Sequence, residues 1–318
     1  MRILMMAVND PAGTGIAFTR AVNRHTEHSC RLLTREIRYN FMFEKDLHLP
    51  WLDSAGLEEV SELLSKSDIF HFHMTADENT RFGPFVPAEH MQGKAVIHHH
   101  HGHPDFRSTP GKFREKYAER NRKNLLASTP DLLKLLPEAK WQPNLVPEND
   151  PLYSQTKGKP DLPVRLVHSP TRTELKDTDR YQGCVNELIR EIPGKIESDI
   201  IRNTPHVECL QRKQRGHILF DHLQGYFGVS SLEGLAQGLC TIAGLDKWNR
   251  EHIQKFAGVA ELPWFISSPQ ALKNDLKTLI RDRDMREELG QYSRTFMVKY
   301  WPEEKVVQYL VDFYQNLK

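Results

Sequence analysis

Cysteine is scarce in this chain, and neither sign of charge is in excess. Four cysteines occur among 318 residues, without any CxxC spacing, at Cys30, Cys184, Cys209 and Cys240. This pattern excludes a disulfide framework and a zinc finger, and it favours a reducing cytoplasm. The net charge of +1 at pH 7 creates no overall field that would attract nucleic acid, so we expect no nucleic-acid partner.

Long apolar runs are missing as well. The chain opens with MRILMMAV, which leads at once into Asn9, Asp10 and Pro11 and is too short for a signal peptide. No apolar run approaches the ~18 residues of a membrane span. We therefore expect a soluble, cytoplasmic protein, and the sequence leaves open a peripheral contact with the inner face of a membrane.

Apolar runs that alternate with helical patterns are typical of doubly wound α/β domains with parallel sheets. Strands are predicted at residues 3–8, 30–34, 68–73, 95–99, 125–128 and 144–146, and then at 164–168, 196–202, 218–221 and 240–243. Helices are predicted at 16–23, 57–65, 111–122, 179–192, 207–215, 228–237, 270–281, 284–299 and 303–316.

A stretch rich in proline and glycine, residues 147–163, interrupts this alternation and predicts a linker between domains. The length of the chain also fits two domains of about 150 residues. We predict one Rossmann-like domain at 1–150, a second at 160–300, and a C-terminal helix at 301–318. Open α/β sheets bind ligands at the carboxyl ends of their strands, so the site is expected in the loops there.

The most informative loop follows the predicted strand 218–221. A helix begins near Gly228 and carries Ser230 and Glu233 in its first turns. The amino end of a helix presents unpaired N–H groups that suit a diphosphate, and a carboxylate one turn further can accept hydrogen bonds from a ribose. An ordinary glycine turn before a buried helix, with Glu233 as a favourable charge at its start, explains the same residues.

The segment FGVSSLEGLAQGLCTIA resembles the signature of group 1, family 4-type glycosyltransferases. The resemblance implies that Glu233 binds the ribose of the donor and that Phe227 lies in the same pocket. Family members usually carry a second glutamate eight residues earlier, where this chain has Gly225. A divergent subset places that acid earlier, which would assign the contact with the donor sugar to Asp221.

A second segment agrees with this resemblance. Arg172 and Lys176 follow the predicted strand 164–168 in HSPTRTELK, where the same family places a pair of cations. Two cations at this position would stabilise a departing diphosphate. The alternative is a solvated loop in which these cations pair with Glu174 and Asp177.

Two loops of the first domain hold further candidates. Gly13 and Gly15 follow the first strand and would let the backbone approach a ligand closely. The HHHHGH run at residues 98–103 ends an apolar strand, and the resemblance implies a catalytic histidine there, assigned to His101 or His103. Adjacent residues on a strand point to opposite faces, and no further ligand sits at helix spacing, so we expect no metal site.

Two other features are interpreted as structural. Alternation along the predicted strand 68–73 places His71 and His73 on one face, where partial burial with backbone hydrogen bonds is expected. The basic stretch 111–124 reads as a solvated helix with two aromatic side chains in the core, and contact with anionic lipid or an acidic acceptor is the alternative.

Together these residues predict a GT-B fold and a metal-independent, retaining, hexosyltransferase-type glycosyltransferase. It would move a sugar from a nucleotide diphosphate-sugar to a hydroxyl of a glycan, lipid or protein acceptor, with no cofactor besides that donor. The alternatives are a non-catalytic protein that binds a nucleotide-sugar or glycan, and a nucleotide-sugar epimerase.

Overall fold

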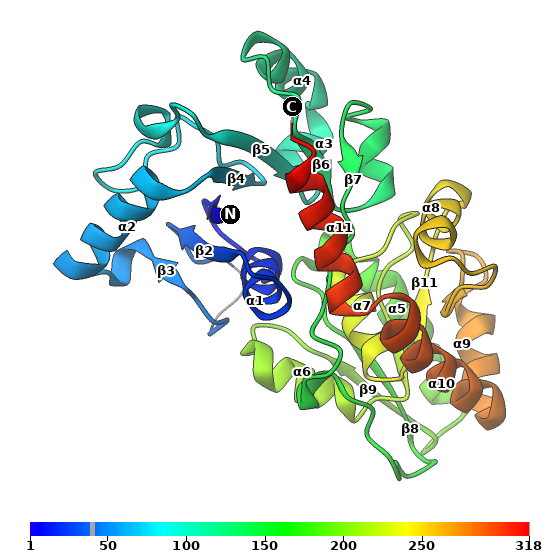
Figure 1. Ribbon diagram of the computed structural model, residues 1–318. Helices are drawn as coiled ribbons and strands as arrows, with labels where there is room; N and C mark the ends of the chain where they lie inside the picture. The colour runs from blue at the N-terminus through cyan, green and yellow to red at the C-terminus, as the bar shows by residue number, and fades with distance from the viewer. Residues whose placement is uncertain (39–41, 318) are drawn as a thin grey trace. The chain divides into compact units, whose positions relative to one another are not determined.

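The computed structural model describes residues 1–38 and 42–317. The chain divides into two compact units, each built around its own parallel sheet (Figure 1). The first unit comprises Met1–Leu145 together with Glu303–Lys318, and the second comprises Val146–Pro302.

The first unit contains a sheet of seven parallel strands in the order β3-β2-β1-β4-β5-β6-β7. The strands are β1 (Arg2–Ala7), β2 (Ser29–Thr34), β3 (Leu47–His48), β4 (Ile69–His73), β5 (Ala95–His100), β6 (Leu125–Ala127) and β7 (Lys140–Trp141). The helices are α1 (Thr14–His25), α2 (Ser54–Lys66), α3 (Pro104–Ser108), α4 (Pro110–Glu119) and α11 (Glu303–Gln315). The strand order reverses between β1 and β4, and such a switch point is where open sheets bind ligands.

Helix α11 is the last of the chain and packs beside α1, near its beginning (Figure 1). The carboxylate of Glu303 accepts hydrogen bonds from Arg24 at 2.6 Å and from His25 at 3.0 Å. The hydroxyl of Tyr314 lies 2.7 Å from Nδ1 of His71. These contacts join α11 to α1 and to the middle of the sheet.

The second unit contains five parallel strands in the order β12-β11-β10-β8-β9. They are β8 (Val164–His168), β9 (Ile196–Ile200), β10 (Ile218–Phe220), β11 (Cys240–Ala243) and β12 (Trp264–Ile266). The helices are α5 (Thr178–Glu191), α6 (His206–Gln214), α7 (Val229–Ala236), α8 (Lys247–Ala257), α9 (Leu272–Arg281) and α10 (Arg283–Tyr300). The buried side chains of β8, β10 and β11 pack against those of α5 and α9 to form its core.

The prediction of doubly wound α/β sheets is confirmed. The predicted strand at 144–146 is wrong, because the last strand of the first sheet is β7. Pro143 and Pro147 flank the predicted segment, and proline has no N–H to donate to a sheet. Sequence reasoning also missed the short strands β3 and β12 and the helices α3 and α8.

Within residues 1–38 and 42–317, no helix combines the length and apolar character that crossing a membrane requires.

Candidate functional site

The carboxyl ends of β8 and β10 meet at the switch point of the second sheet, since the strand that follows β8 in the chain lies on the other side. The loop after β8 and the start of α7 therefore lie next to each other. A hydrogen bond of 2.9 Å between the hydroxyls of Ser169, after β8, and Ser230, in α7, joins them. Four of the predicted residues, Lys176, Asp221, Gly228 and Ser230, come together at this point.

The first residues of α7 are held by a carboxylate at the end of β10. Asp221 accepts hydrogen bonds from the backbone N–H of Gly228 at 2.6 Å and from the hydroxyl of Ser231 at 2.7 Å. Burial favours a raised pKa for this carboxyl, but nearby cationic groups and these donors bring the pKa below its usual range. Asp221 therefore positions the loop and the helix, and its oxygens already have partners.

Lys176 lies directly against this helix start. Its Nζ is 3.2 Å from Oδ1 of Asp221. A Cβ atom built on Gly228 would come within 2.9 Å of that Nζ. Glycine at this position thus lets the ammonium reach the amino end of α7. A cation and a helix amino end at one place form a site for an anion.

Glu233 is one turn further along α7 and is only 6% exposed. One carboxylate oxygen lies 2.8 Å from Nε2 of His206, and the other accepts a hydrogen bond from Lys213. Burial alone would raise the pKa of Glu233, but Lys213 and His206 outweigh it and lower the pKa to about 2. The ion pair keeps Glu233 negatively charged in a buried position.

Lys213 also donates to the hydroxyl of Ser230 at 2.9 Å, so it is a second cation next to the first turn of α7. Sequence reasoning missed both Lys213 and His206, which resemble solvated residues of a polar helix. Their spacing could have indicated a shared partner, because residues seven apart lie on the same face of a helix. That face of α6 is directed at Glu233.

Arg172 and Phe227 have different surroundings from those predicted. The guanidinium of Arg172 is partly exposed and bonds to Glu174 at 2.7 Å. The ring of Phe227 is buried, with ring centres 5.3 Å from Trp264 and 6.1 Å from Trp301. Lys176 thus lies at the helix start, Arg172 lies in the outer part of the loop, and Phe227 belongs to the core.

Gly225 occupies the position where the resembling family has a second glutamate. Its φ of 90° is in the left-handed region, which strongly favours glycine. A Cβ built on Gly225 would lie 3.7 Å from the carboxyl group of Asp246. The loop therefore has a different backbone from one that carries a glutamate, and the nearest acid is Asp246.

The glycine loop after β1 already binds a carboxyl group of the chain itself, that of Asp10. Asp10 accepts hydrogen bonds from the N–H groups of Gly15 at 3.1 Å and Ile16 at 3.0 Å. Gly13 has φ 65°, and a Cβ there would clash with the ring of Phe43. The positive φ of Gly13 favours glycine there, and Asp10 already occupies the N–H groups of Gly15 and Ile16 in the first turn of α1.

The two candidate catalytic histidines lie just beyond β5. His101 is partly exposed, and its Nε2 lies 2.9 Å from Nδ1 of His73. Burial of the ring lowers the pKa of His101 to about 3. His103 precedes α3, where its Nδ1 accepts a hydrogen bond from the N–H of Asp105 at 3.2 Å. His101 is therefore neutral at pH 7, and His103 caps a helix.

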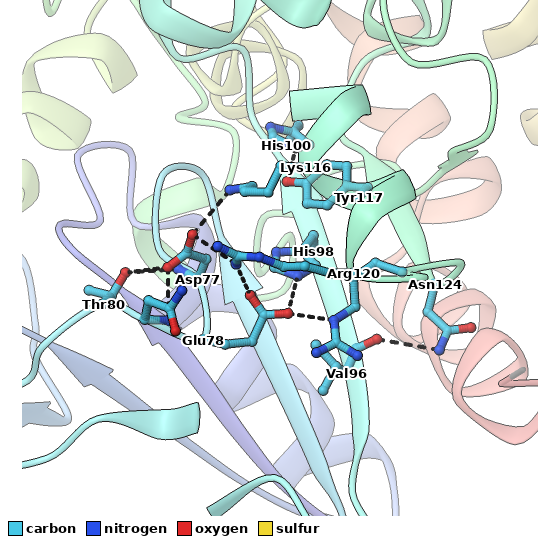
Figure 2. A network of polar contacts seen from close by, with 12 residues as sticks. Asp77, Glu78, Thr80, Val96, His98, His100, Lys116, Tyr117, Arg120 and Asn124 are labelled. Atoms are coloured by element: carbon cyan, nitrogen blue, oxygen red, sulfur yellow. Dashed lines mark hydrogen bonds and ion pairs between the residues drawn. The ribbon is translucent and has the colours of Figure 1, made fainter. Parts of the chain in front are cut away.

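Three cations of the basic stretch 111–124 contact two acidic residues that follow β4. Figure 2 shows Lys116 and Arg120 bonded to Asp77, and Arg120 bonded also to Glu78. Glu78 is 3% exposed and further contacts Arg122 and His98. Arg114, in the same stretch, pairs with Glu138.

The amino-acid sequence has little similarity to known families and curated proteins. No profile of a known protein family matches the chain. The chain is 27% identical over 140 residues to the glutamate racemase of Histophilus somni (strain 129Pt), which is 42% of this chain. It spans about half the length of that racemase (50%). A match of this extent does not establish a family.

The fold, in contrast, is similar to solved structures over nearly the whole chain. HepE from Anabaena, in complex with UDP and glucose, has a TM-score of 0.64 at 13% identity, with 100% of each chain covered. Sucrose-phosphate synthase from Thermosynechococcus elongatus has a TM-score of 0.62 at 11% identity, covering 99% of this chain and 98% of that one. The UDP-GlcNAc 2-epimerase from Neisseria meningitidis, bound to UDP-GlcNAc, has 0.55 at 12%, covering 99% and 100%.

The chain therefore has the GT-B fold, which the sequence resemblance predicted. Membership of the family 4-type group stays a prediction, as do the roles of the site residues.

Proposed function

We propose that this protein is a metal-independent, retaining glycosyltransferase of the hexosyltransferase type, and that its donor is a UDP-sugar. The acceptor would be a hydroxyl group on a glycan, lipid or protein. Support for uridine comes from several proteins of the same fold whose structures contain UDP or a UDP-sugar. Retention and metal independence follow from the sequence resemblance.

One observation carries this proposal: Lys176, Lys213 and the amino end of α7 converge at the switch point of the second sheet. Asp221 and Glu233 already pair with these two cations, so the partly exposed Lys176 and the N–H groups at the amino end of α7 are the groups that would attract an anion. A diphosphate that follows the loop after β8 fits this arrangement.

In the proposed reaction, the bond between C1 of the sugar and the diphosphate oxygen breaks, a bond from C1 to the acceptor oxygen forms, and the proton of the acceptor hydroxyl passes to an oxygen of the departing diphosphate. The departing diphosphate gains negative charge, which Lys176 and the N–H groups of α7 stabilise. Arg172 would leave Glu174 and add to this stabilisation. Interactions that grow as charge develops accelerate the reaction, whereas equal binding of substrate and transition state does not.

Glu233 would bind the ribose while it remains paired. A carboxylate has about four acceptor positions, and Lys213 and His206 use two of them. The ion pair keeps the carboxylate ionised, so it can accept hydrogen bonds from the ribose hydroxyls.

A thermal-shift panel of UDP-, GDP-, CDP- and dTDP-sugars tests donor binding, and donor hydrolysis then tests turnover. We expect UDP-sugars to raise the unfolding temperature and to be hydrolysed slowly. Lys176→Met and Arg172→Met should lower turnover much more than stability. Lys247→Met is the matched control, because Lys247 starts the next helix, α8, and is highly exposed.

Other results would assign a different function. Stabilisation by a donor without hydrolysis or transfer to any acceptor would favour a binding protein. An epimerised donor, detected by NMR, would favour an epimerase. The donor site is refuted if no nucleotide-sugar changes the unfolding temperature of the unmodified chain and Glu233→Ala shows the same result in the panel.

A further inference from the structure

Four histidines share one face of the first sheet at the carboxyl ends of two neighbouring strands. His71 and His73 lie on β4, His99 lies on β5, and His101 follows β5 directly. The parallel register pairs His73 with His99. Strand β4 borders the switch point between β1 and β4, where open sheets bind ligands.

The other histidines of β5 point to the opposite face, as alternation along a strand requires. His98 contacts Glu78, and Nε2 of His100 lies 2.7 Å from the hydroxyl of Tyr117 (Figure 2). The run of histidines is thus two separate sets. The face of the sheet that carries His99 holds more imidazoles than the opposite face, because β4 adds His71 and His73 there.

Three of these imidazoles form a compact, buried group. His71, His73 and His99 are 0%, 2% and 1% exposed, respectively. One ring nitrogen from each can be chosen so that all three lie within 4.8 Å of one another. The ring centres of His71 and His73 are 4.5 Å apart, and the ring centre of His99 is 5.3 Å and 5.4 Å from them.

One ring nitrogen of His71 and one of His73 make hydrogen bonds, and the other nitrogen of each ring makes none to any residue that the structure describes. Nδ1 of His71 contacts the Tyr314 hydroxyl at 2.7 Å, and Nδ1 of His73 contacts His101 at 2.9 Å. Among the described residues, Nε2 of His71, Nε2 of His73 and both nitrogens of His99 have no hydrogen-bond partner. Histidines that bind a metal typically show this pattern, with the second nitrogen held by an outer partner.

We propose that His71, His73 and His99 bind one divalent transition-metal ion, with Zn²⁺ as the preferred occupant. Zn²⁺ takes imidazole nitrogens at about 2.0–2.1 Å, and a tetrahedral site places them roughly 3.4 Å apart. The present limit of 4.8 Å on the separations is wider than that spacing, so binding requires the three rings to turn toward a common centre. The site goes beyond sugar transfer, since its residues have no part in the diphosphate site.

The chemistry of the three rings supports this ion. Burial lowers the pKa of His71 to about 3 and the pKa of His73 and His99 well below the usual range, so neutral lone pairs are present at pH 7. Three neutral ligands leave the full charge of the ion, so a hydroxide or another anion from solvent would complete the shell. Partly exposed His101 lies beside the group, with its ring centre 5.1 Å from that of His73 and 4.1 Å from that of His99.

The ion would tie β4 and β5 together and, through Tyr314, connect them to α11. Sequence reasoning missed this site because the ligands come from two strands 26 to 28 residues apart in the chain, and helix spacing gives no sign of them.

The test uses the full chain without a histidine tag, stripped of metal with a chelator. Titration with Co²⁺ should give one ion per chain and visible d–d bands of a tetrahedral nitrogen and oxygen shell. The charge-transfer bands of thiolate ligands should be missing, which excludes the cysteines. Zn²⁺ should displace the Co²⁺ and raise the unfolding temperature.

Four variants locate the ion. His73→Gln and His99→Gln should lose the Co²⁺ spectrum and the Zn²⁺-induced shift. His100→Gln, on the same strand but the opposite face, should keep both. Tyr314→Phe should bind Zn²⁺ about 10–100-fold more weakly, because it removes the outer partner of His71.

Absence of uptake by the unmodified chain would overturn the proposal and leave a cluster of neutral histidines. Unchanged uptake in His73→Gln and His99→Gln would also overturn it, by showing an adventitious surface ion. If those variants fail to fold, the stoichiometry and spectrum of the unmodified chain and of Tyr314→Phe decide. Donor binding in the second unit is measured separately, so failure of one proposal is distinguishable from failure of the other.

Discussion

Replacing Lys213 with methionine tests the buried ion pair at the centre of the second unit. The change removes the ammonium and keeps a side chain of similar length, which leaves the carboxylate of Glu233 with His206 as its remaining side-chain partner. Lys213 is 1% exposed and Glu233 is 6% exposed, so solvent screens the pair little. Removing one partner of a buried pair costs about 3–5 kcal/mol.

The pKa of Glu233 gives a similar magnitude. It is about 2 in the folded chain against 4.5 for the free group, and 1.36 kcal/mol per unit gives about 3 kcal/mol. A carboxyl with a pKa lowered by folding contributes stability that is complete above its unfolded pKa and is lost as the pH falls through its folded pKa. In the natural sequence this contribution is therefore complete at pH 7 and declines between about pH 4.5 and 2. In Lys213→Met, burial raises the pKa, so acidification from pH 7 should recover stability.

Hydrogen exchange measured by mass spectrometry suits a chain with two units, because it reports the opening of α6 and α7 separately from that of the first unit. We expect faster exchange in those helices for Lys213→Met at pH 7. Combining Lys213→Met with Glu233→Gln should recover much of the loss, because no unpaired charge stays buried. A loss below about 1 kcal/mol for Lys213→Met, independent of pH, would refute the buried pair.

Three further changes test other parts of the fold, each by denaturant unfolding. Gly225→Glu should lower the free energy of unfolding by roughly 1–2 kcal/mol, because a side chain at positive φ is strained, and donor turnover should not rise; increased turnover would contradict the different backbone described for this loop. Asp10→Ala should cost about 1 kcal/mol by removing the acceptor for the first N–H groups of α1, and an unchanged midpoint would contradict that role. Glu78→Gln should cost about 3 kcal/mol, because it removes the charged partner of Arg122 and leaves Arg120 with Asp77 alone in a mostly buried network; a loss under 1 kcal/mol would show that water screens these charges.

Local patterns in the sequence were enough to predict the fold class. Apolar runs marked the central strands, and a glycine before α7 marked the start of that helix. Alternation also predicted that the HHHHGH run divides between two faces, which the positions of His99 and His100 confirm. These features depend on residues that are close together in the chain, so the sequence alone is enough to predict them.

The partners of the site residues could not be predicted in the same way. Glu233 pairs with Lys213 because α6 and α7 pack together, and Asp221 accepts from Gly228 across a loop. His71 and His73 were expected to bond to the backbone, whereas they contact Tyr314 and His101. Such contacts depend on which strands are neighbours and in what register, and no local pattern encodes that.

The position of α11 has a consequence for how the molecule is made. The first unit includes Glu303–Lys318, so its two parts are separated by the whole of the second unit. When the ribosome has synthesised the chain as far as Leu145, helix α11, which packs on α1 and contacts His71, has not yet been made. The unit encoded first is completed last, after the second has had time to fold. A chain truncated before Glu303 should therefore show its damage near the amino terminus, far along the sequence from the deletion.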